Sequence, residues 1–195
     1  MVKIKTSVFC RSNGFDDKNQ LNEAIEFIEI IKPFILGKEL KEIFVSQFAY
    51  GTDTKRLPII PIDHYIKRNK HAVAWEDYIV LIIGEEQLEL NLWAPWQYKL
   101  GLNTLQIDEI KRRPSTHLIP VCSSNFDTRT LYDISEAYKE NLIGNKVAHI
   151  FIESNFGDAC EAVIIELDNG KSVKIYEDCD EVHIVDWLDS RGVRV

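Results

Sequence analysis

The segment Glu177–His183 combines carboxylates, a thiol and an imidazole, the residue types that bind metal ions. A zinc site needs three or four ligands that converge at about 2 Å, normally from separated pairs. This segment follows a strand pattern, and neighbouring residues of a strand point to opposite sides. We therefore expect a solvated acidic turn here, with no metal ion and no cofactor.

A second candidate for chemistry is His64, in a loop made rigid by Pro58 and Pro61. A general base needs a nucleophile within hydrogen-bond reach, and none of the common nucleophile-elbow, phosphate-loop, dinucleotide or zinc-protease motifs is present. The loop Trp93–Tyr98 is rich in aromatic residues, which are frequent in binding hot spots, and we expect Trp96 to be exposed. A small hydrolase or small-molecule-binding enzyme with its site around His64 and this loop is one hypothesis, without an assigned catalytic residue.

Charge is the most uneven property of the chain. The 195 residues include 31 acids and 23 bases, a net charge of -8, and the segment 151–190 contains eleven acids and two bases. A general nucleic-acid binder should be basic, so this class is disfavoured. Concentrated negative charge steers a basic partner towards it, although an acidic sheet also simply keeps a protein soluble. We predict partner contacts at Glu153, Asp158, Glu177, Asp178, Asp180, Glu181 and Trp96.

Two helices precede the strands that must position these residues. The first is expected from about residue 18 to 31, because Asp17 can cap it and Pro33 should break it before Gly37 turns the chain. Its apolar stripe is wide enough to be covered on more than half of the circumference, and consists of Leu21, Ala24, Ile25, Phe27, Ile28, Ile30 and Ile31. The second helix is expected from about residue 128 to 141, ended by Gly144.

The segments 35–45 and 142–152 match each other, with Gly37 on Gly144 and a long strand after each glycine. The match predicts that one unit, a helix ended by glycine and followed by a strand and a hairpin, occurs twice. The alternative is chance similarity. The fold class we predict is α+β, with two related helix-plus-antiparallel-sheet units packed as one body. The best boundary divides residues 1–113 from 114–195, although one compact domain is also compatible.

Both hairpins can be assigned a register from their apolar faces. In the second, a three-residue loop 168–170 pairs Ile165 with Val173 and requires a left-handed Gly170. In the first, a tip at residues 85–86 pairs Leu81 with Leu90. The strand 79–83 is apolar without alternation, so we expect it to be covered on both faces.

The N-terminus alternates bases with apolar residues and does not resemble a secretory signal, and no apolar stretch is long enough to span a membrane. Four cysteines without a Cys-x-x-Cys pair indicate a reducing compartment. We expect a cytoplasmic protein.

One family resemblance rests on the motif Leu142-Ile143-Gly144-x-x-Val147 before a strand, and on a hairpin turned by Leu167-Asp168-Asn169-Gly170. In a small acidic chain this resembles the immunity proteins of bacterial polymorphic and contact-dependent toxin systems. The resemblance covers residues 142–176 and, through the internal match, 35–45. Its motifs are structural, so no binding residue is carried over. It implies a tight, non-catalytic inhibitor that occludes a basic toxin domain, often a nuclease.

Overall fold

The computed structural model of the chain describes residues 3–11, 19–47, 73–75, 79–94, 97–104, 106–107, 118–122, 128–154, 162–178 and 181–187. Its elements in chain order are β1 (Thr6–Arg11), α1 (Asn19–Ile35), β2 (Leu40–Gln47), β3 (Val73–Trp75), β4 (Ile79–Ile83), β5 (Glu86–Ala94), β6 (Gln97–Leu102), β7 (Gln106–Ile107), β8 (Leu118–Cys122), β9 (Thr128–Asp133), the 3-10 helix η1 (Ser135–Tyr138), β10 (Val147–Glu153), β11 (Ala162–Leu167), β12 (Ser172–Asp178) and β13 (Glu181–Trp187).

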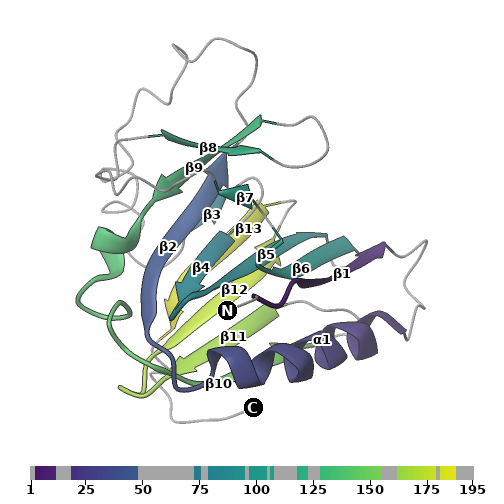
Figure 1. Ribbon diagram of the computed structural model, residues 1–195, viewed down its shortest axis with the longest axis horizontal. Coiled ribbons are helices and arrows are strands. Elements are labelled where there is room, and N and C mark those ends of the chain that lie inside the picture. Colours follow the sequence, from purple (N-terminus) through teal and green to yellow (C-terminus); the bar gives the residue numbers. More distant parts are fainter. Residues whose placement is uncertain are drawn as a thin grey trace.

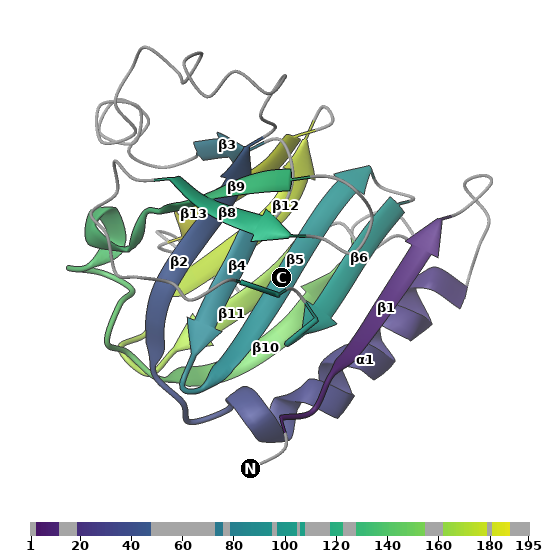
Figure 2. The same ribbon diagram turned by 45° about the horizontal axis from the view of Figure 1, so that its top comes forward.

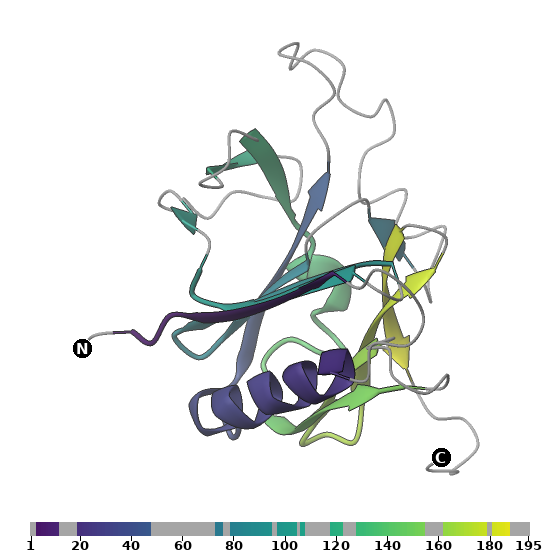
Figure 3. The same ribbon diagram turned by 90° about the vertical axis from the view of Figure 1, so that its right-hand side faces the viewer.

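The described strands form two antiparallel sheets, which confirms the predicted α+β class. The order is β1-β6-β5-β4-β2-β9-β8-β7 in the first sheet and β10-β11-β12-β13-β3 in the second. The sheets face each other where β5 contacts β12 and β13, and α1 packs against both sheets, through β1 and β10, on the same side of the first sheet as the second sheet (Figures 1 and 3). The apolar core lies between the first sheet, the second sheet and α1.

The match between the two sequence segments is a repeat of structure. The Gly37 N–H donates to the Val147 carbonyl over 2.8 Å, and the Gly144 N–H donates to the Leu40 carbonyl over 2.9 Å. Under the sequence match, Gly37 corresponds to Gly144 and Leu40 to Val147, so each of these bonds is the counterpart of the other. The following strands also cross their sheets in the same order, β2-β4-β5-β6 in one and β10-β11-β12-β13 in the other. The two glycine turns therefore meet in an antiparallel bridge between Glu39 and Lys146, and the strands that follow them have the same order.

Both long strands contain a bulge at the matching place. The register shifts between Leu40 and Glu42 in β2, and between Val147 and His149 in β10. An extra residue changes the phase of the side-chain alternation, so residues three apart in each strand reach the core. The bulge explains the loose alternation of both strand patterns.

The helix α1 continues to Ile35, whereas we predicted that it ends at about residue 31, before Pro33. Pro33 lies in the last turn, where its fixed φ suits a helix and only one hydrogen bond near the end is lost. The Leu36 N–H still donates to the Lys32 carbonyl over 3.0 Å. Gly37 then turns the chain with a φ of 72°, as predicted.

A smaller part of the circumference of α1 is buried than the apolar pattern predicts. Ile25 and Ile30 are 43% and 44% exposed, so the prediction was wrong at these two positions. The helix contacts β10 and β1, and these contacts cover a single side. That side consists of Ala24, Phe27, Ile28, Ile31 and Ile35.

The predicted helix over residues 128–141 does not form, and this part of the prediction was wrong. Residues 128–133 are β9, which pairs with β2 so that Val45 lies opposite Tyr132. The edge of β2 offers backbone groups that a strand satisfies and a helix cannot, and this tertiary pairing outweighs the local helical pattern.

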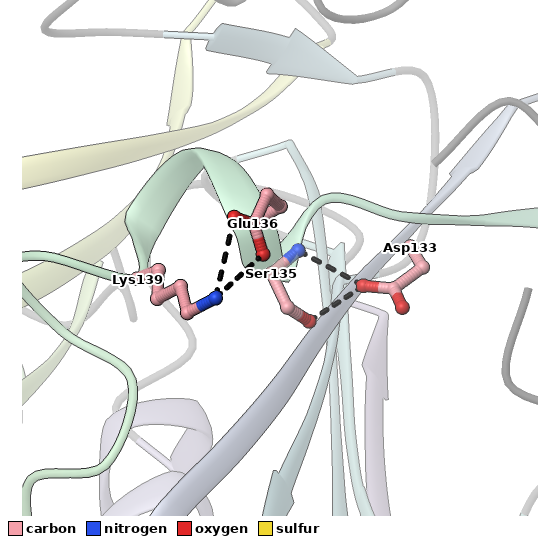
Figure 4. A network of polar contacts seen from close by, with 4 residues as sticks. All are labelled: Asp133, Ser135, Glu136 and Lys139. Carbon is pink, nitrogen blue, oxygen red and sulfur yellow. Dashed lines mark hydrogen bonds and ion pairs between the residues drawn. The ribbon is translucent and has the colours of Figure 1, made fainter. Parts of the chain in front are cut away.

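After β9 the chain keeps bonding to β2 through Ser135, which also bonds to Asp133 (Figure 4). The Ser135 hydroxyl accepts from the Ile43 N–H over 2.9 Å and donates to Asp133 Oδ1 over 2.5 Å. The Ile134 N–H donates to the Ile43 carbonyl over 2.9 Å. The 3-10 helix η1 is thus held at the strand edge, with an exposed Glu136–Lys139 ion pair on its outer side (Figure 4).

The second hairpin has the register that we predicted, and the first does not. Ile165 lies opposite Val173, and Gly170 has a φ of 79°. In the first hairpin the tip is residues 84–85, so Leu81 pairs with Leu88. The glycine at 84 supplies the left-handed φ of a two-residue turn. The two-residue difference leaves every side chain on its predicted face.

The strand β4 is covered on both faces, as predicted, with four of its five residues buried. The division at residue 113 stays a prediction. The two sheets exchange strands across it, because β3 completes the second sheet and β9 extends the first.

Candidate functional site

Four of the six predicted acidic contacts have their backbones at one end of the second sheet: Glu153, Glu177, Asp178 and Glu181. In an antiparallel sheet β10 and β12 end where β11 and β13 begin, and the register sets Glu153 beside Ala162 and Asp178 beside Glu181. The backbone of Glu177 is part of the same strand end. Figures 1 and 2 show this end of the sheet where β12 meets β13. The side chains of Glu177, Asp178 and Glu181 lie outside the described part of the structure.

Two connections leave this end of the sheet, residues 155–161 and 179–180. They lie outside the described residues, and Asp158 and Asp180 with them, but their sequences contain three acids and no lysine or arginine. The strands β10 to β13 together contain one lysine and no arginine. We call this strand end the acidic end, defined by the four described acids Glu153, Glu177, Asp178 and Glu181.

Glu153 differs from the other acids because its charge is compensated internally. Its Oε2 atom lies 2.5 Å from Lys174 Nζ, and the two side chains are 25% and 23% exposed. The same ammonium lies 5.7 Å from the centre of the Tyr176 ring, within the range of a cation–π contact. Lys174 therefore neutralises Glu153 and anchors it on the sheet.

The outer face of β10 presents an apolar side chain that the sequence pattern did not reveal. Ile150 belongs to the core and Ile152 packs against it, so His149, Phe151 and Glu153 alternate on the outer face. Phe151 is 39% exposed. The bulge after Val147 determines which residues of β10 face outward. Counting the alternation of side chains across this bulge could have predicted the outward position of Phe151.

Most of the site named in the enzyme hypothesis lies outside the described residues. His64 and Trp96 lie outside the described residues, and so does the side chain of Trp93. Tyr98, at the end of the same aromatic loop, is 1% exposed and belongs to the core, where it lies opposite Leu92. Its ring is therefore structural.

A buried carboxylate on β5 was not singled out by the sequence. Glu89 is 1% exposed and accepts hydrogen bonds from the Thr104 N–H over 2.7 Å and from Gln87 Nε2 over 2.6 Å. Glu89 alternates with the core residues Leu88 and Leu90 and so lies on the other face of β5. The hydrogen bonds satisfy a charge that burial would otherwise destabilise, which indicates a structural role.

Among the described residues, no three His, Cys, Asp or Glu side chains come together as a metal-binding group. No helix in the described ranges is long and apolar enough to cross a membrane.

Comparison with known proteins found no matching family model, no matching curated protein and no matching solved structure.

Proposed function

We propose that this chain is a non-catalytic protein-binding module, an immunity-type inhibitor that docks an acidic surface on a basic partner such as a toxin domain. It works in the cytoplasm and acts by occlusion, without a cofactor. The observation that carries the proposal is the convergence of the acidic strand ends on one end of the second sheet.

The backbone register pairs two acids at this end of the sheet. Asp178 and Glu181 are direct partners across two strands, an arrangement that destabilises a sheet. A basic partner would relieve this repulsion on binding and would be steered towards the acidic end. This gives the charge a role beyond solubility.

The test uses the basic C-terminal domain of a secreted protein encoded next to this chain. Association of the purified proteins is measured by stopped flow at low and moderate salt, with wild type and the double variant D178K/E181K. The variant should associate more slowly at low salt by a factor on the order of ten or more, and the difference should shrink as salt screens the charges.

The matched control is E39K/E140K, which changes the net charge equally at two exposed acids outside the acidic end. It should associate much as wild type does. The proposal fails if the neighbouring domain does not bind, if binding is indifferent to ionic strength, or if both double variants slow association equally.

A further inference from the structure

We propose that Asn169 is a site of deamidation, which the turn of the second hairpin protects in the folded protein. Asn169 is followed by Gly170, and both residues are exposed. In such a pair the backbone nitrogen of the glycine can attack the side-chain amide of the asparagine, because glycine has no side chain to hinder the approach. The reaction needs no enzyme and no partner, so this inference is independent of the proposed function.

The reaction consists of two steps. The Gly170 nitrogen loses its proton to water and forms a bond to Cγ of Asn169, while the bond from Cγ to Nδ2 breaks and ammonia leaves with a proton from the solvent. The product is a succinimide ring. Water then opens this ring at either of its two carbonyl carbons and gives aspartate or isoaspartate at position 169. A carboxylate replaces the neutral amide, and in isoaspartate the backbone also gains a methylene group.

In the folded turn, hydrogen bonds engage both reacting groups. The Gly170 N–H donates to the Leu167 carbonyl over 3.0 Å, so the attacking nitrogen must first give up this bond. Asn169 Oδ1 accepts from the Lys171 N–H over 3.0 Å, and Asn169 Nδ2 donates to the Asn141 carbonyl over 2.9 Å. The side-chain amide is therefore fixed at both of its polar atoms. The reaction proceeds in molecules whose turn has opened, and such local opening is a normal fluctuation of exposed turns.

The turn is also bonded to the segment that leads into β10. The Asp168 N–H donates to the Lys146 carbonyl over 2.9 Å, and Asp168 Oδ1 accepts from the Lys146 N–H over 3.0 Å. Lys171 Nζ donates to Asn141 Oδ1. Together with the bond from Asn169 to Asn141, these contacts hold the turn closed from outside. The rate of deamidation should therefore depend on the contact between Lys171 and Asn141 as well as on the Asn-Gly pair.

Deamidation breaks one of these contacts and strains the turn. A carboxylate at position 169 has no N–H to donate, and one of its oxygens takes the place of Nδ2, 2.9 Å from the Asn141 carbonyl oxygen. An acceptor that loses its donor and faces another acceptor is destabilised. Isoaspartate in addition lengthens a loop whose length sets the register of Ile165 against Val173. The turn thus converts a slow chemical change into a permanent loss of stability in the second sheet.

The first experiment measures the rate of deamidation at mildly alkaline pH, in the folded full chain and in urea, by mass spectrometry of the peptide that contains residue 169. A second Asn-Gly pair, Asn13 with Gly14, lies outside the described residues and is the reference in urea, where incubation continues until Asn13 has converted. We expect Asn169 to react in urea at a rate similar to Asn13, and about tenfold or more slowly when folded. The proposal fails if Asn169 stays intact in urea, or if it reacts equally fast in the folded protein.

The second experiment tests the contacts that hold the turn closed. K171M removes the bond to Asn141 and should speed deamidation of the folded protein severalfold, with an unchanged rate in urea. The matched control K146M removes an exposed lysine from the same end of the sheet and keeps the backbone bonds to Asp168, so it should leave both rates unchanged. If K171M reacts at the wild-type rate, or if K146M speeds the reaction equally, this contact does not protect Asn169 and that part of the proposal is wrong.

The third experiment tests the consequence for stability. N169D has the carboxylate of one product, whereas N169S removes the amide without adding a charge. We expect N169D to unfold at a lower urea concentration than both wild type and N169S, because its carboxylate faces the Asn141 carbonyl. A urea midpoint of N169D equal to that of wild type would overturn the link between deamidation and the stability of the second sheet.

Discussion

Substitution of Gly101 by alanine tests the buried carboxylate of Glu89. The two residues lie opposite each other in β6 and β5. A Cβ atom on residue 101 would lie 2.4 Å from Glu89 Oε2 and 2.7 Å from Thr104 Oγ1. Neither distance is possible for a methyl group, so the Glu89 carboxylate must move away from Thr104, whose N–H and hydroxyl both donate to it.

The cost follows from the hydrogen bonds that this movement breaks. A hydrogen bond to a charged group contributes about 1.5–3 kcal/mol, and Glu89 is 1% exposed, so water cannot replace the lost donors. Replacing glycine by alanine in a strand offsets about 0.5–1 kcal/mol of this loss. We expect G101A to lower the free energy of unfolding by about 2–4 kcal/mol, which moves the urea midpoint by about 1–2 M for an ordinary denaturant slope.

A double-mutant cycle with E89A separates this collision from a general intolerance of side chains at position 101. E89A removes the carboxylate, so G101A should cost little in that background, and the coupling free energy between the two sites should exceed about 1 kcal/mol. The reasoning is refuted if G101A unfolds at the same urea concentration as wild type, or if the two substitutions are additive.

Three further substitutions test separate features. G144A should lower the free energy of unfolding by about 1–2 kcal/mol in urea, because its φ of 87° is unfavourable for alanine although the space around it is open; an unchanged midpoint would contradict this. In a cycle of K174A and E153A, the half-buried ion pair should show a coupling of about 1 kcal/mol, above that of an exposed pair, and additivity would argue against it. The hydrogen bond from Lys41 to Glu85 lowers the pKa of this carboxyl, so K41A should raise that pKa in an NMR titration. Since the pKa is lowered on folding, the contribution of Glu85 to stability is present above its unfolded pKa and is lost as pH falls through its folded pKa; an unmoved titration in K41A would rule out this cause.

The parts of the fold that the sequence predicts correctly are those that local patterns decide. In the second hairpin, a loop of the wrong length would turn the face with Ile165 and Val173 away from the core, so only one register survives. In the first hairpin, two registers keep the same face inward, and the pattern of apolar residues cannot choose between them. The left-handed turn at Gly84 makes the choice.

The predictions are wrong where the structure of a segment depends on contacts with residues far away in the sequence. Residues 128–133 carry a helical spacing, and the edge of β2, more than eighty residues earlier in the chain, makes them a strand. The concentration of acids was visible in the sequence, and the antiparallel order of β10 to β13 brings the backbones of Glu153, Glu177, Asp178 and Glu181 to one end of the sheet. The pairing of Glu153 with Lys174 and the exposure of Phe151 depend on a bulge that leaves no sign in the composition.

The two units have the same strand order, but a different element covers the edge of the first strand in each. Ile43 in β2 corresponds to Ile150 in β10, and the backbone groups of Ile43 are bonded to Ile134 and Ser135. Beside β10 stands α1 instead, a helix that protects the strand edge by covering it. A strand added to a sheet satisfies the backbone hydrogen-bonding groups of the neighbouring strand. A helix laid along a sheet edge instead adds a solvent-facing side of its own. The two units therefore differ at the strand edges that follow their glycine turns, although the sequences of these strands match.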